Sequence, residues 1–484
     1  MLNEANENTC LSNDSPKLYL DDRSDENETR FKANTSTIRE LLFIARSSAP
    51  LIVTFFLQYS LTVVSIFSVG HIGKTELAAV SLATMTFNVT VSIFNGMATC
   101  LDTFCAQAYG AKKHYLVGLY FQRCTAMIFV CSIPILFFWC FSASFLKLVV
   151  PEKNLAILAQ TYLRYISFGA PGYILFETGK RFLQAQNIYT AGQYCLFLVA
   201  PLNVCLNYLL VWNKTFGIGF IGAPISTAIS YWLMSFILLG YVIFVDGRNC
   251  WYGLQIKKAF NIRQWSTMMS LALNGTVMLL SEFIAFEILT LSASRFGTSA
   301  LAAQSVASTI ATLSFQVPFG VSVAISTRIA NYIGAHDLES ARIANKVAYI
   351  LAVIIGITNF CLLIGGRSII ANSFTNDKKV VAIAVKVLTV LGINQLYDCA
   401  NVLFAGCLRG QGRQKLGSLL NLIAYYIIAI PLALILAFKL DLGLTGLWYG
   451  LGFGILLLAI SESWFVLHSD WNKIAESSSK RNQE

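Results

Sequence analysis

The feature that most constrains this chain is a series of about twelve apolar runs, each close to the 20 residues that a helix needs to cross a bilayer. They are centred near residues 55, 88, 128, 168, 202, 232, 276, 312, 353, 392, 426 and 455. Hydrophobic residues make up 56% of the chain and charged residues 12%, whereas soluble proteins average about 25% charged residues. The sequence therefore predicts an all-α polytopic membrane protein with twelve transmembrane helices.

The apolar runs also divide the chain into its expected domains. Residues 1–40 are polar, contain no apolar core of a signal peptide, and are interpreted as a disordered cytoplasmic tail. Residues 41–246 hold the first six spans and residues 264–468 the last six, with a cytoplasmic loop at 247–263 between them. Residues 469–484, which end in ESSSKRNQE, are expected to form a second disordered cytoplasmic tail.

An internal repeat relates the two groups of six spans. A shift of 224 residues places GKTELAAVSLAT (73–84) on GTSALAAQSVAS (297–308), and 11 of the 39 positions aligned without a gap are identical. The identical pairs include Gly96 and Gly320, and Gly110 and Gly334. This repeat predicts two six-helix bundles related by a pseudo-two-fold axis along the membrane normal. Secondary transporters often have this plan, with the binding site between the halves.

The distribution of basic residues predicts the orientation of the chain. Lys and Arg are more numerous in the loops on the side of the N-terminus, which favours a cytoplasmic N-terminus. An even number of spans then places the C-terminus in the cytoplasm too. The net charge of +10 is attributed to these loops and not to a nucleic-acid partner. We expect a multi-pass protein of a eukaryotic vacuolar or plasma membrane, with one glycosylation sequon, Asn213, on an outer loop.

Several function classes lack their signatures in this sequence. No GxxxxGK[ST] phosphate-binding loop occurs, and the 12 cysteines form no CxxC pair. The four histidines fall near the ends of predicted helices, at His71, His114, His336 and His468. The sequence therefore predicts a protein that is not an enzyme and binds no metal or cofactor. A transporter of this kind would be driven by an ion gradient.

Two glutamates, Glu282 and Glu287, interrupt the apolar run SLALNGTVMLLSEFIAFEILTLSAS (270–294), which contains no basic residue. An ionised glutamate at the bilayer centre costs about 2.5–3.5 kcal/mol. Each carboxyl group should therefore face a water-filled cavity or be protonated part of the time, which would make it a proton carrier. The two residues point about 140° apart on a helix. We therefore expect one of them to face the cavity and the other to pack inside its own bundle.

The repeat gives these positions counterparts in the first half. Glu282 aligns with Gln58, which forms one polar helix face with Thr54 and Thr62. Asn274 aligns with Pro50, where we expect a kink in the first helix. Gln58 and Asn274 are thus candidate polar residues of the cavity, and only the second half makes this position acidic.

Asp398 is the third candidate carboxylate. With Asn394 and Asn401 it forms one polar face of an apolar span, and its first-half counterpart is Tyr173. All four are candidate site residues. The alternative is that Asp398 is bonded to neighbouring amides in a purely structural network. Three further acidic residues are expected to be structural, with local partners or positions near the ends of spans: Asp102, Glu177 and Glu462.

Five motifs give the sequence its resemblance to the eukaryotic multidrug and toxic compound extrusion (MATE) family. They are GHIGKTELAAVSLA (70–83), LDTFCAQAYGA (101–111), SEFIAFE (281–287), GVSVAISTRIANYIGA (320–335) and GCLRGQGRQ (406–414). They occur in the order of that family, and the resemblance covers about residues 40–468.

The resemblance implies an alternating-access antiporter that exports organic cations or other amphipathic compounds in exchange for protons. The family residues implicated in proton coupling match Glu282 and Asp398, and the second acidic residue of the seventh helix matches Glu287. The acidic residue that some bacterial relatives carry in the first helix has no counterpart, since Gln58 is neutral, which argues against sodium coupling. The expected partners are an organic cation or amphipathic substrate, protons and the lipid bilayer, and the protein is expected to be a monomer.

Two alternative functions remain open from the sequence. A flippase for lipid-linked substrates uses the same plan, and prominent basic residues deep in the cavity helices would favour it. A membrane scaffold or receptor that transports nothing would not depend on Glu282 or Asp398.

Overall fold

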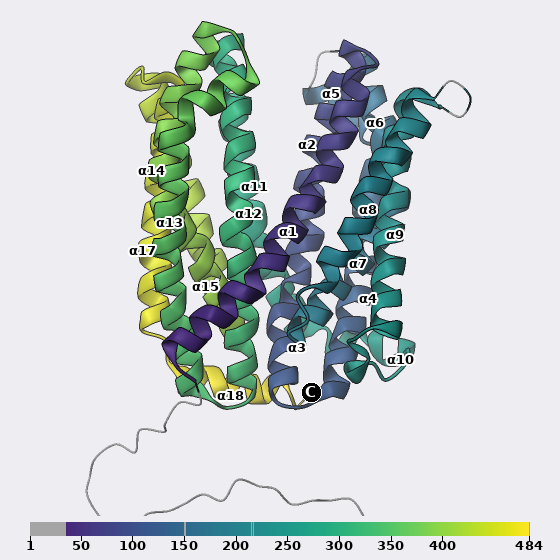
Figure 1. Ribbon diagram of the computed structural model, residues 1–484, viewed down its shortest axis with the longest axis vertical. Coiled ribbons are helices and arrows are strands. Elements are labelled where there is room, and N and C mark those ends of the chain that lie inside the picture. The colour runs from purple at the N-terminus through teal and green to yellow at the C-terminus, as the bar shows by residue number, and fades with distance from the viewer. Residues whose placement is uncertain (1–34, 150–151, 214, 216, 484) are drawn as a thin grey trace, which may run out of the picture. The chain divides into compact units, whose positions relative to one another are not determined.

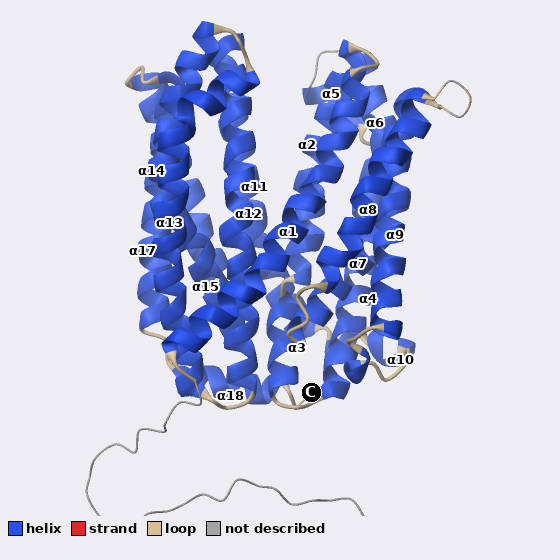
Figure 2. Ribbon diagram, in the orientation of Figure 1, coloured by secondary structure: helices blue, strands red, loops and turns tan. Residues whose placement is uncertain are grey.

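The structure is a computed structural model that describes residues 35–149, 152–213, 215 and 217–483, and within these ranges it is helical without strands (Figure 2). Most of the predicted N-terminal tail, residues 1–34, lies outside the described residues.

The helices of the first half form one bundle, called here the N-bundle (Figure 1). They are α1 (Thr37–Gly70), α2 (Lys74–Ala98), α3 (Cys100–Gly110), α4 (His114–Cys140), α5 (Ala143–Val149), α6 (Lys153–Ile166), α7 (Ala170–Ala185), α8 (Ala191–Asn207) and α9 (Gly222–Phe244). A short helix, α10 (Ile256–Ala259), lies in the connection to the second half.

The helices of the second half form the C-bundle. They are α11 (Ser266–Ala293), α12 (Thr298–Gly334), α13 (Leu338–Phe374), α14 (Lys378–Gln411), α15 (Gln414–Leu422), α16 (Ile430–Leu434) and α17 (Gly443–Leu467). The π-helical segment η7 (Ile423–Ala429) joins α15 to α16, and a second one, η8 (Ile435–Lys439), continues α16, so that the four segments form one long crossing. A last helix, α18 (Trp471–Arg481), follows α17.

Eleven helices in the described part of the chain are long and apolar enough to cross a membrane. The remaining predicted span, centred near residue 168, is formed by α6 and α7 with a 3-10 turn between them. This crossing is less apolar because it carries Arg164, Glu177, Lys180 and Arg181. With it, the chain makes the twelve crossings in two bundles that its sequence predicts.

Helices α1 and α11 each pass from one bundle to the other. In α1, Ile44 packs in the core of the C-bundle and Leu61 in the core of the N-bundle, with Pro50 between them. Helix α11 makes the opposite crossing, because Met268 packs in the core of the N-bundle and Leu289 in that of the C-bundle. Gln58 and Glu282 therefore lie at equivalent points of the two helices, just beyond the place where each helix passes from one bundle to the other.

The glycines of the internal repeat lie where the bundles touch. A methyl group on Gly96 would be 2.4 Å from the Thr276 Cα of α11, and one on Gly320 would be 2.7 Å from the Ile52 Cγ1 of α1. Ile52 and Thr276 are themselves 224 residues apart, so the same contact is made twice. The repeat keeps these glycines because only a residue without a side chain lets the two helices approach so closely.

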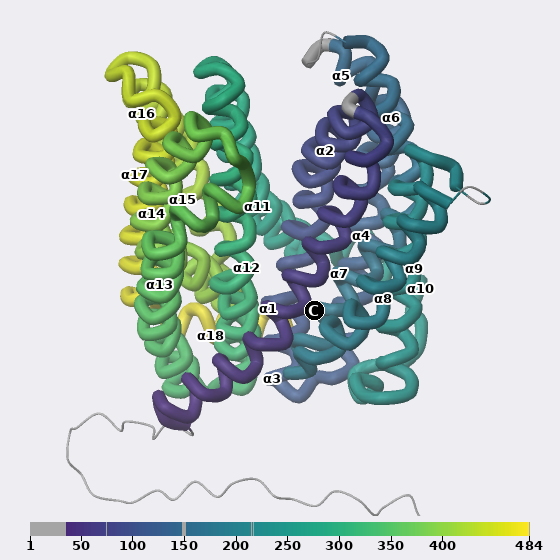
Figure 3. The backbone as a smooth tube through the Cα atoms, turned by 45° about the horizontal axis from the view of Figure 1, so that its top comes forward, coloured from purple at the N-terminus to yellow at the C-terminus, as the bar shows by residue number. Residues whose placement is uncertain are grey.

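A second symmetric contact lies at the end of the bundles that carries the loops 110–114 and 334–338, called here the sealed end. A methyl group on Gly110 would be 2.0 Å from the carbonyl oxygen of Asn331, and one on Gly334 would be 2.0 Å from that of Gln107. These backbone contacts hold α3 and α12 together across the boundary. In Figures 1 and 3, α18 lies at this same end.

The C-terminal segment differs from its prediction, because α18 is a helix and not a disordered tail. Asp470 caps it by accepting a hydrogen bond from the Lys473 backbone N–H at 3.2 Å. Its apolar residues Trp471 and Ile474 join the core of the C-bundle. A polar segment of this length is stable as a helix only when it has a surface to pack on. The spacing of Trp471 and Ile474 marks its apolar side, but the local sequence does not identify the surface that this side meets.

Candidate binding cavity

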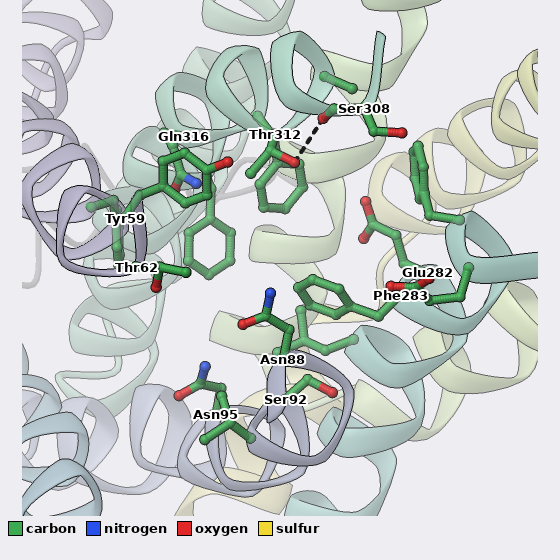
Figure 4. A pocket seen from close by; sticks show the side chains of 18 of the residues that line it. Tyr59, Thr62, Asn88, Ser92, Asn95, Glu282, Phe283, Ser308, Thr312 and Gln316 are labelled. Atoms are coloured by element: carbon green, nitrogen blue, oxygen red, sulfur yellow. Dashed lines mark hydrogen bonds between the residues drawn. The ribbon is translucent and has the colours of Figure 1, made fainter. Parts of the chain in front are cut away.

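A cavity of about 400 Å³ lies between the bundles, with walls from both of them. Helices α1, α2, α7 and α9 of the N-bundle and helices α11, α12, α14 and α17 of the C-bundle supply its lining. Figure 4 shows Glu282 and Phe283 of α11 across the cavity from Tyr59 and Thr62 of α1. The crossing points of α1 and α11 thus bring the two equivalent segments to opposite walls.

Glu282 and Glu287 both line the cavity, which corrects the expectation that one of them would pack inside its bundle. The face of α11 that lines the cavity also includes Leu279, Phe283 and Phe286. At about 100° per residue this face spans about 140°, with Glu282 and Glu287 at its two edges. The predicted angle between the two glutamates is therefore consistent with the structure. The expectation failed because the face of α11 that lines the cavity is wide enough to include both of them.

Neither glutamate has a hydrogen-bond donor or an ion-pair partner among the described residues, and both are half-buried. Glu282 lies within electrostatic range of Asp398, a like charge when both are ionised. Arg409 of the C-bundle acts on Glu282 electrostatically, but among the described residues no cation forms an ion pair with these carboxylates. The wall that carries them attracts cations and protons.

Asp398 also lines the cavity, but amides surround it. It accepts a hydrogen bond from Gln395 Nε2 at 3.3 Å and lies beside the Asn401 amide. Gln395 is in turn held by Asn359 Nδ2 at 3.0 Å. Asn401 is buried behind the cavity wall. The amide network weighed from the sequence is thus present, and it leaves Asp398 at the cavity surface.

Asn394 lines the cavity and joins α14 to α17. It accepts a hydrogen bond from the Tyr397 hydroxyl at 2.5 Å and donates one to the Trp448 carbonyl at 3.2 Å. Trp448, whose ring also lines the cavity, donates from Nε1 to Gln304 at 2.8 Å. This network fixes the aromatic wall beside the carboxylates.

In the N-bundle, the position equivalent to Glu282 belongs to an ion pair. Gln58 donates a hydrogen bond to Glu177 Oε1 at 2.8 Å and accepts one from Lys180 Nζ at 3.2 Å. Lys180 and Glu177 form a buried salt bridge at 2.8 Å. Glu177 lines the cavity instead of lying at a span end, and Lys180 lies with it inside α7. The one carboxylate of this wall is therefore neutralised.

A second buried ion cluster connects the bundles. Asp102 accepts two hydrogen bonds from Arg181 Nη1 at 2.6 and 2.7 Å, and its Oδ2 lies 3.9 Å from Arg409 Nε of the C-bundle. Asp102 therefore has distant partners and not the local ones expected. Arg181 reaches the cavity lining as well. The cavity helices thus contain buried basic residues, the feature that would favour a flippase. Each of them is paired with an acidic residue.

Tyr173 and Asn274 differ in their relation to the cavity. Tyr173 lines it and donates a hydrogen bond to Asn95 Oδ1 at 3.0 Å. Asn274 lies outside the lining and joins α11 to α15, since it accepts a hydrogen bond from Ser418 Oγ at 2.6 Å. Of the eight candidate site residues, Asn274 and Asn401 are the two that the cavity does not include.

Much of the cavity lining is aromatic and was not assigned from the sequence. Its rings include Phe55, Tyr59, Phe87, Tyr231, Phe283, Phe286, Phe315 and Phe319. A polar group on α2 was also missed, although Asn88, Ser92 and Asn95 lie at helical spacing on one face (Figure 4). That spacing in an apolar span is the signal that could have identified them. The aromatic residues carry no such signal, because apolar rings face lipid as well as cavities.

Comparison with known proteins assigns both halves of the chain to one family model. The MatE model matches residues 50–209 and again residues 276–435. The double match agrees with the internal repeat and with the two bundles.

Several curated proteins are similar to this chain along most of its length. An uncharacterized transporter of Saccharomyces cerevisiae is 47% identical, over 90% of this chain and 62% of its own length. Protein DETOXIFICATION 17 of Arabidopsis thaliana is 32% identical, over 90% of this chain and 91% of its own. Multidrug and toxin extrusion protein 1 of Homo sapiens is 27% identical, over 92% of this chain and 77% of its own.

Solved structures share the fold. The crystal structure of the eukaryotic MATE transporter AtDTX14 superposes with a TM-score of 0.84 at 26% identity, over 92% of this chain and 99% of that one. The Vibrio cholerae MATE transporter VcmN in its bent form has a TM-score of 0.79 at 18% identity, over 92% and 99% of the two chains.

Proposed function

This chain belongs to the MatE family and is a multi-pass membrane transporter, and from that premise we propose that it is a proton-coupled antiporter. It exports organic cations or other amphipathic compounds in exchange for protons by alternating access. The observation that carries this proposal is the placement of Glu282 in the cavity wall, half-buried and without a donor or cation partner in the described part of the chain. A carboxyl group in this setting can bind either a cation or a proton.

The chemistry of the cavity supports a cationic, amphipathic substrate. Ionised Glu282, Glu287 and Asp398 give the C-bundle wall a negative potential, while aromatic rings cover much of the remaining lining. Aromatic faces attract organic cations by about 0.5–2 kcal/mol each, and more when water is excluded. The rings also bind apolar groups without requiring one shape, which suits a broad range of compounds.

The exchange follows from the competition of proton and substrate for the same carboxylates. An ionised Glu282 holds the cation, and protonation removes that attraction and releases it. A protonated carboxyl group also costs less to enclose in hydrocarbon than an ionised one. The proton-loaded transporter therefore returns through the closed state and delivers the proton on the other side.

We further propose that the sealed end faces the cytoplasm, because the basic loops and both termini are expected there. The state described here would then be closed toward the cytoplasm. Protons and not sodium are the proposed coupling ion, since Gln58 is neutral and the nearby Glu177 is already paired with Lys180. A monomer in the vacuolar or plasma membrane would suffice, because the cavity is complete within one chain.

A flippase for lipid-linked phosphates is the second candidate, and the presence of Arg181 in the cavity lining favours it. However, Arg181 is bound by Asp102 and Lys180 by Glu177. Neither cation is free to hold a phosphate group. The unpaired charges of the cavity are acidic, which favours a cationic substrate.

The proposal is tested with purified protein in lipid vesicles and a fluorescent organic cation, taken up under an imposed pH gradient. Glu282→Gln keeps the size of the side chain but cannot ionise, and it should reduce uptake by about a hundredfold, the scale of losing one positioned proton-transfer group. Glu339→Gln, an exposed position paired with Arg342, is the matched control. An unchanged rate in Glu282→Gln would reject proton coupling at this residue.

A further inference from the structure

Glu462 of α17 is a buried acid that the exchange described above does not use. Its side chain is 0% exposed, and neither carboxylate oxygen has a hydrogen-bond partner among the described residues. An ionised carboxylate buried without donors would cost several kcal/mol. This setting therefore favours the protonated form of Glu462 over the ionised form.

The nearest cation does not neutralise Glu462. Arg409 of α14 lies within electrostatic range of it, but its guanidinium donates to Ser322 Oγ at 2.7 Å and approaches Asp102 across the bundle boundary. No ion pair within 4.0 Å joins Arg409 to Glu462 in the described residues. Arg409 thus makes its close contacts with Ser322 and with Asp102 across the bundle boundary, and not with Glu462.

The titratable groups around Glu462 come from four packed elements. Glu282 of α11, Tyr425 of η7 and Cys407 and Arg409 of α14 lie within electrostatic range of it. On α13, the Tyr349 hydroxyl is bound to the Ser463 carbonyl at 2.8 Å. Helix α16 carries no titratable residue, and Lys415 of α15 and Lys439 of η8 are exposed.

Tyr425 belongs to η7, which packs against both α17, the helix of Glu462, and α11, the helix of Glu282. The Tyr425 side chain is 1% exposed, its hydroxyl lies beside the Asn401 amide, and it is within electrostatic range of Glu282, Asp398 and Glu462. It belongs to a π-helical turn, a feature that often marks functional sites in helices. A hydroxyl in this place can accept a proton from one carboxyl group and give its own to another.

Glu462 also lies nearer the sealed end than Glu282 does. It is about 8 Å along α17 from the end of that helix at Leu467, whereas Glu282 is about 24 Å along α11 from Ser266. A proton bound at Glu282 can exchange with the cavity. A proton bound at Glu462 lies toward the sealed end, which the contacts between the bundles close.

We propose that Glu462 is a third proton-binding site of this transporter, and that Tyr425 connects it to Glu282. The inference rests on the proposed proton coupling. When the sealed end opens and Arg409 leaves Asp102, the Glu462 O–H bond breaks and its proton goes to water on that side. Water that enters through the open end then links these groups. Through it the carboxylate takes the hydroxyl proton of Tyr425, and Tyr425 takes the proton of Glu282, so that one proton crosses without a net change on the tyrosine.

The test uses the full-length transporter in vesicles with two readouts. Glu462→Gln has the shape of the protonated acid, and it should reduce uptake driven by a pH gradient about tenfold or more, while substrate exchange without a gradient stays normal. Tyr425→Phe should have the same effect, Glu462→Asp should retain coupled uptake, and Tyr449→Phe on the exposed face of α17 should change nothing.

Infrared spectroscopy supplies the direct observation. The unmodified protein should show a carbonyl band of a buried protonated carboxylic acid that Glu462→Gln lacks, and the band should change when substrate and pH gradient are applied. Normal coupled uptake in Glu462→Gln, together with loss of uptake in Glu282→Gln, would overturn this inference alone. Normal coupled uptake in both variants would overturn the proposed function as well.

Discussion

Glu282 and Gln58 occupy equivalent positions in the two bundles, but their electrostatic surroundings differ. Gln58 completes an ion pair between Glu177 and Lys180, so the wall of the N-bundle carries no free charge there. Glu282 has no such partner in the described residues. The molecule thus concentrates its titratable chemistry in one bundle and uses the other as a neutral, aromatic surface.

Removal of Lys180 should show how strongly the N-bundle depends on this ion pair. Lys180→Met leaves Glu177 buried without its cation, which typically costs about 3–5 kcal/mol. We expect a clearly lower midpoint of thermal unfolding in detergent, with recovery in the double variant Glu177→Gln/Lys180→Met. Lys415→Met on the exposed face of α15 serves as the control. An unfolding midpoint that stays the same in Lys180→Met would contradict a structural role for the pair.

At the scale of elements, α1 and α11 are the parts that connect both bundles to the cavity. Each leaves one bundle near the sealed end and enters the other beside the cavity, and each is held at its crossing by a glycine of the opposite bundle, Gly320 and Gly96. Opening of the sealed end has to separate these contacts. The same two helices therefore supply cavity-lining residues and the contacts that close the sealed end.

A methyl group at Gly96 should disfavour the closed sealed end. Gly96→Ala places that group 2.4 Å from the Thr276 Cα, a backbone atom that cannot turn away. We expect faster labelling of cysteines introduced at the sealed end. Gly365→Ala, where a methyl group meets nothing within 4 Å, is the matched control on α13. Labelling rates equal to those of the parent protein would show that the contact does not hold the bundles together.

The elements also show what the sequence could predict. Hydropathy and the repeat were sufficient to predict the twelve crossings and the two bundles, because both patterns are visible along the sequence without knowledge of which helices touch. The ion clusters were not accessible, since Asp102 and Arg409 are 307 positions apart in the chain and meet only at the bundle boundary. Helix α18 was missed for the same reason, because the surface that stabilises it comes from other helices.

At the scale of the whole molecule, α18 spans the boundary between the bundles. Its apolar face packs on the C-bundle, while Arg481 Nη2 donates to Gln107 Oε1 at 2.9 Å and the Tyr120 hydroxyl of the N-bundle donates to the Arg481 carbonyl at 2.7 Å. Lys113 Nζ adds a bond to the Asn482 carbonyl at 2.9 Å. Burial lowers the pKa of the Arg481 guanidinium to about 10, so it remains charged at neutral pH.

Loss of the Arg481 contact should loosen the sealed end. In Arg481→Ala, spin labels at Lys112 and His336, two exposed loop positions on different bundles, should show a larger population at long distance. Lys480→Ala, which removes only an exposed pair with Glu476, should leave the distances as they are. Identical distance distributions in all three proteins would mean that α18 follows the bundles passively.

The proposed exchange depends on competition between substrate and proton for the carboxylates of the C-bundle. It is tested most directly by measuring protons released into weakly buffered solution when an organic cation is added to the purified transporter in detergent. We expect proton release from the unmodified protein and markedly less from Glu282→Gln. Binding of the cation by the unmodified protein without any proton release would contradict it.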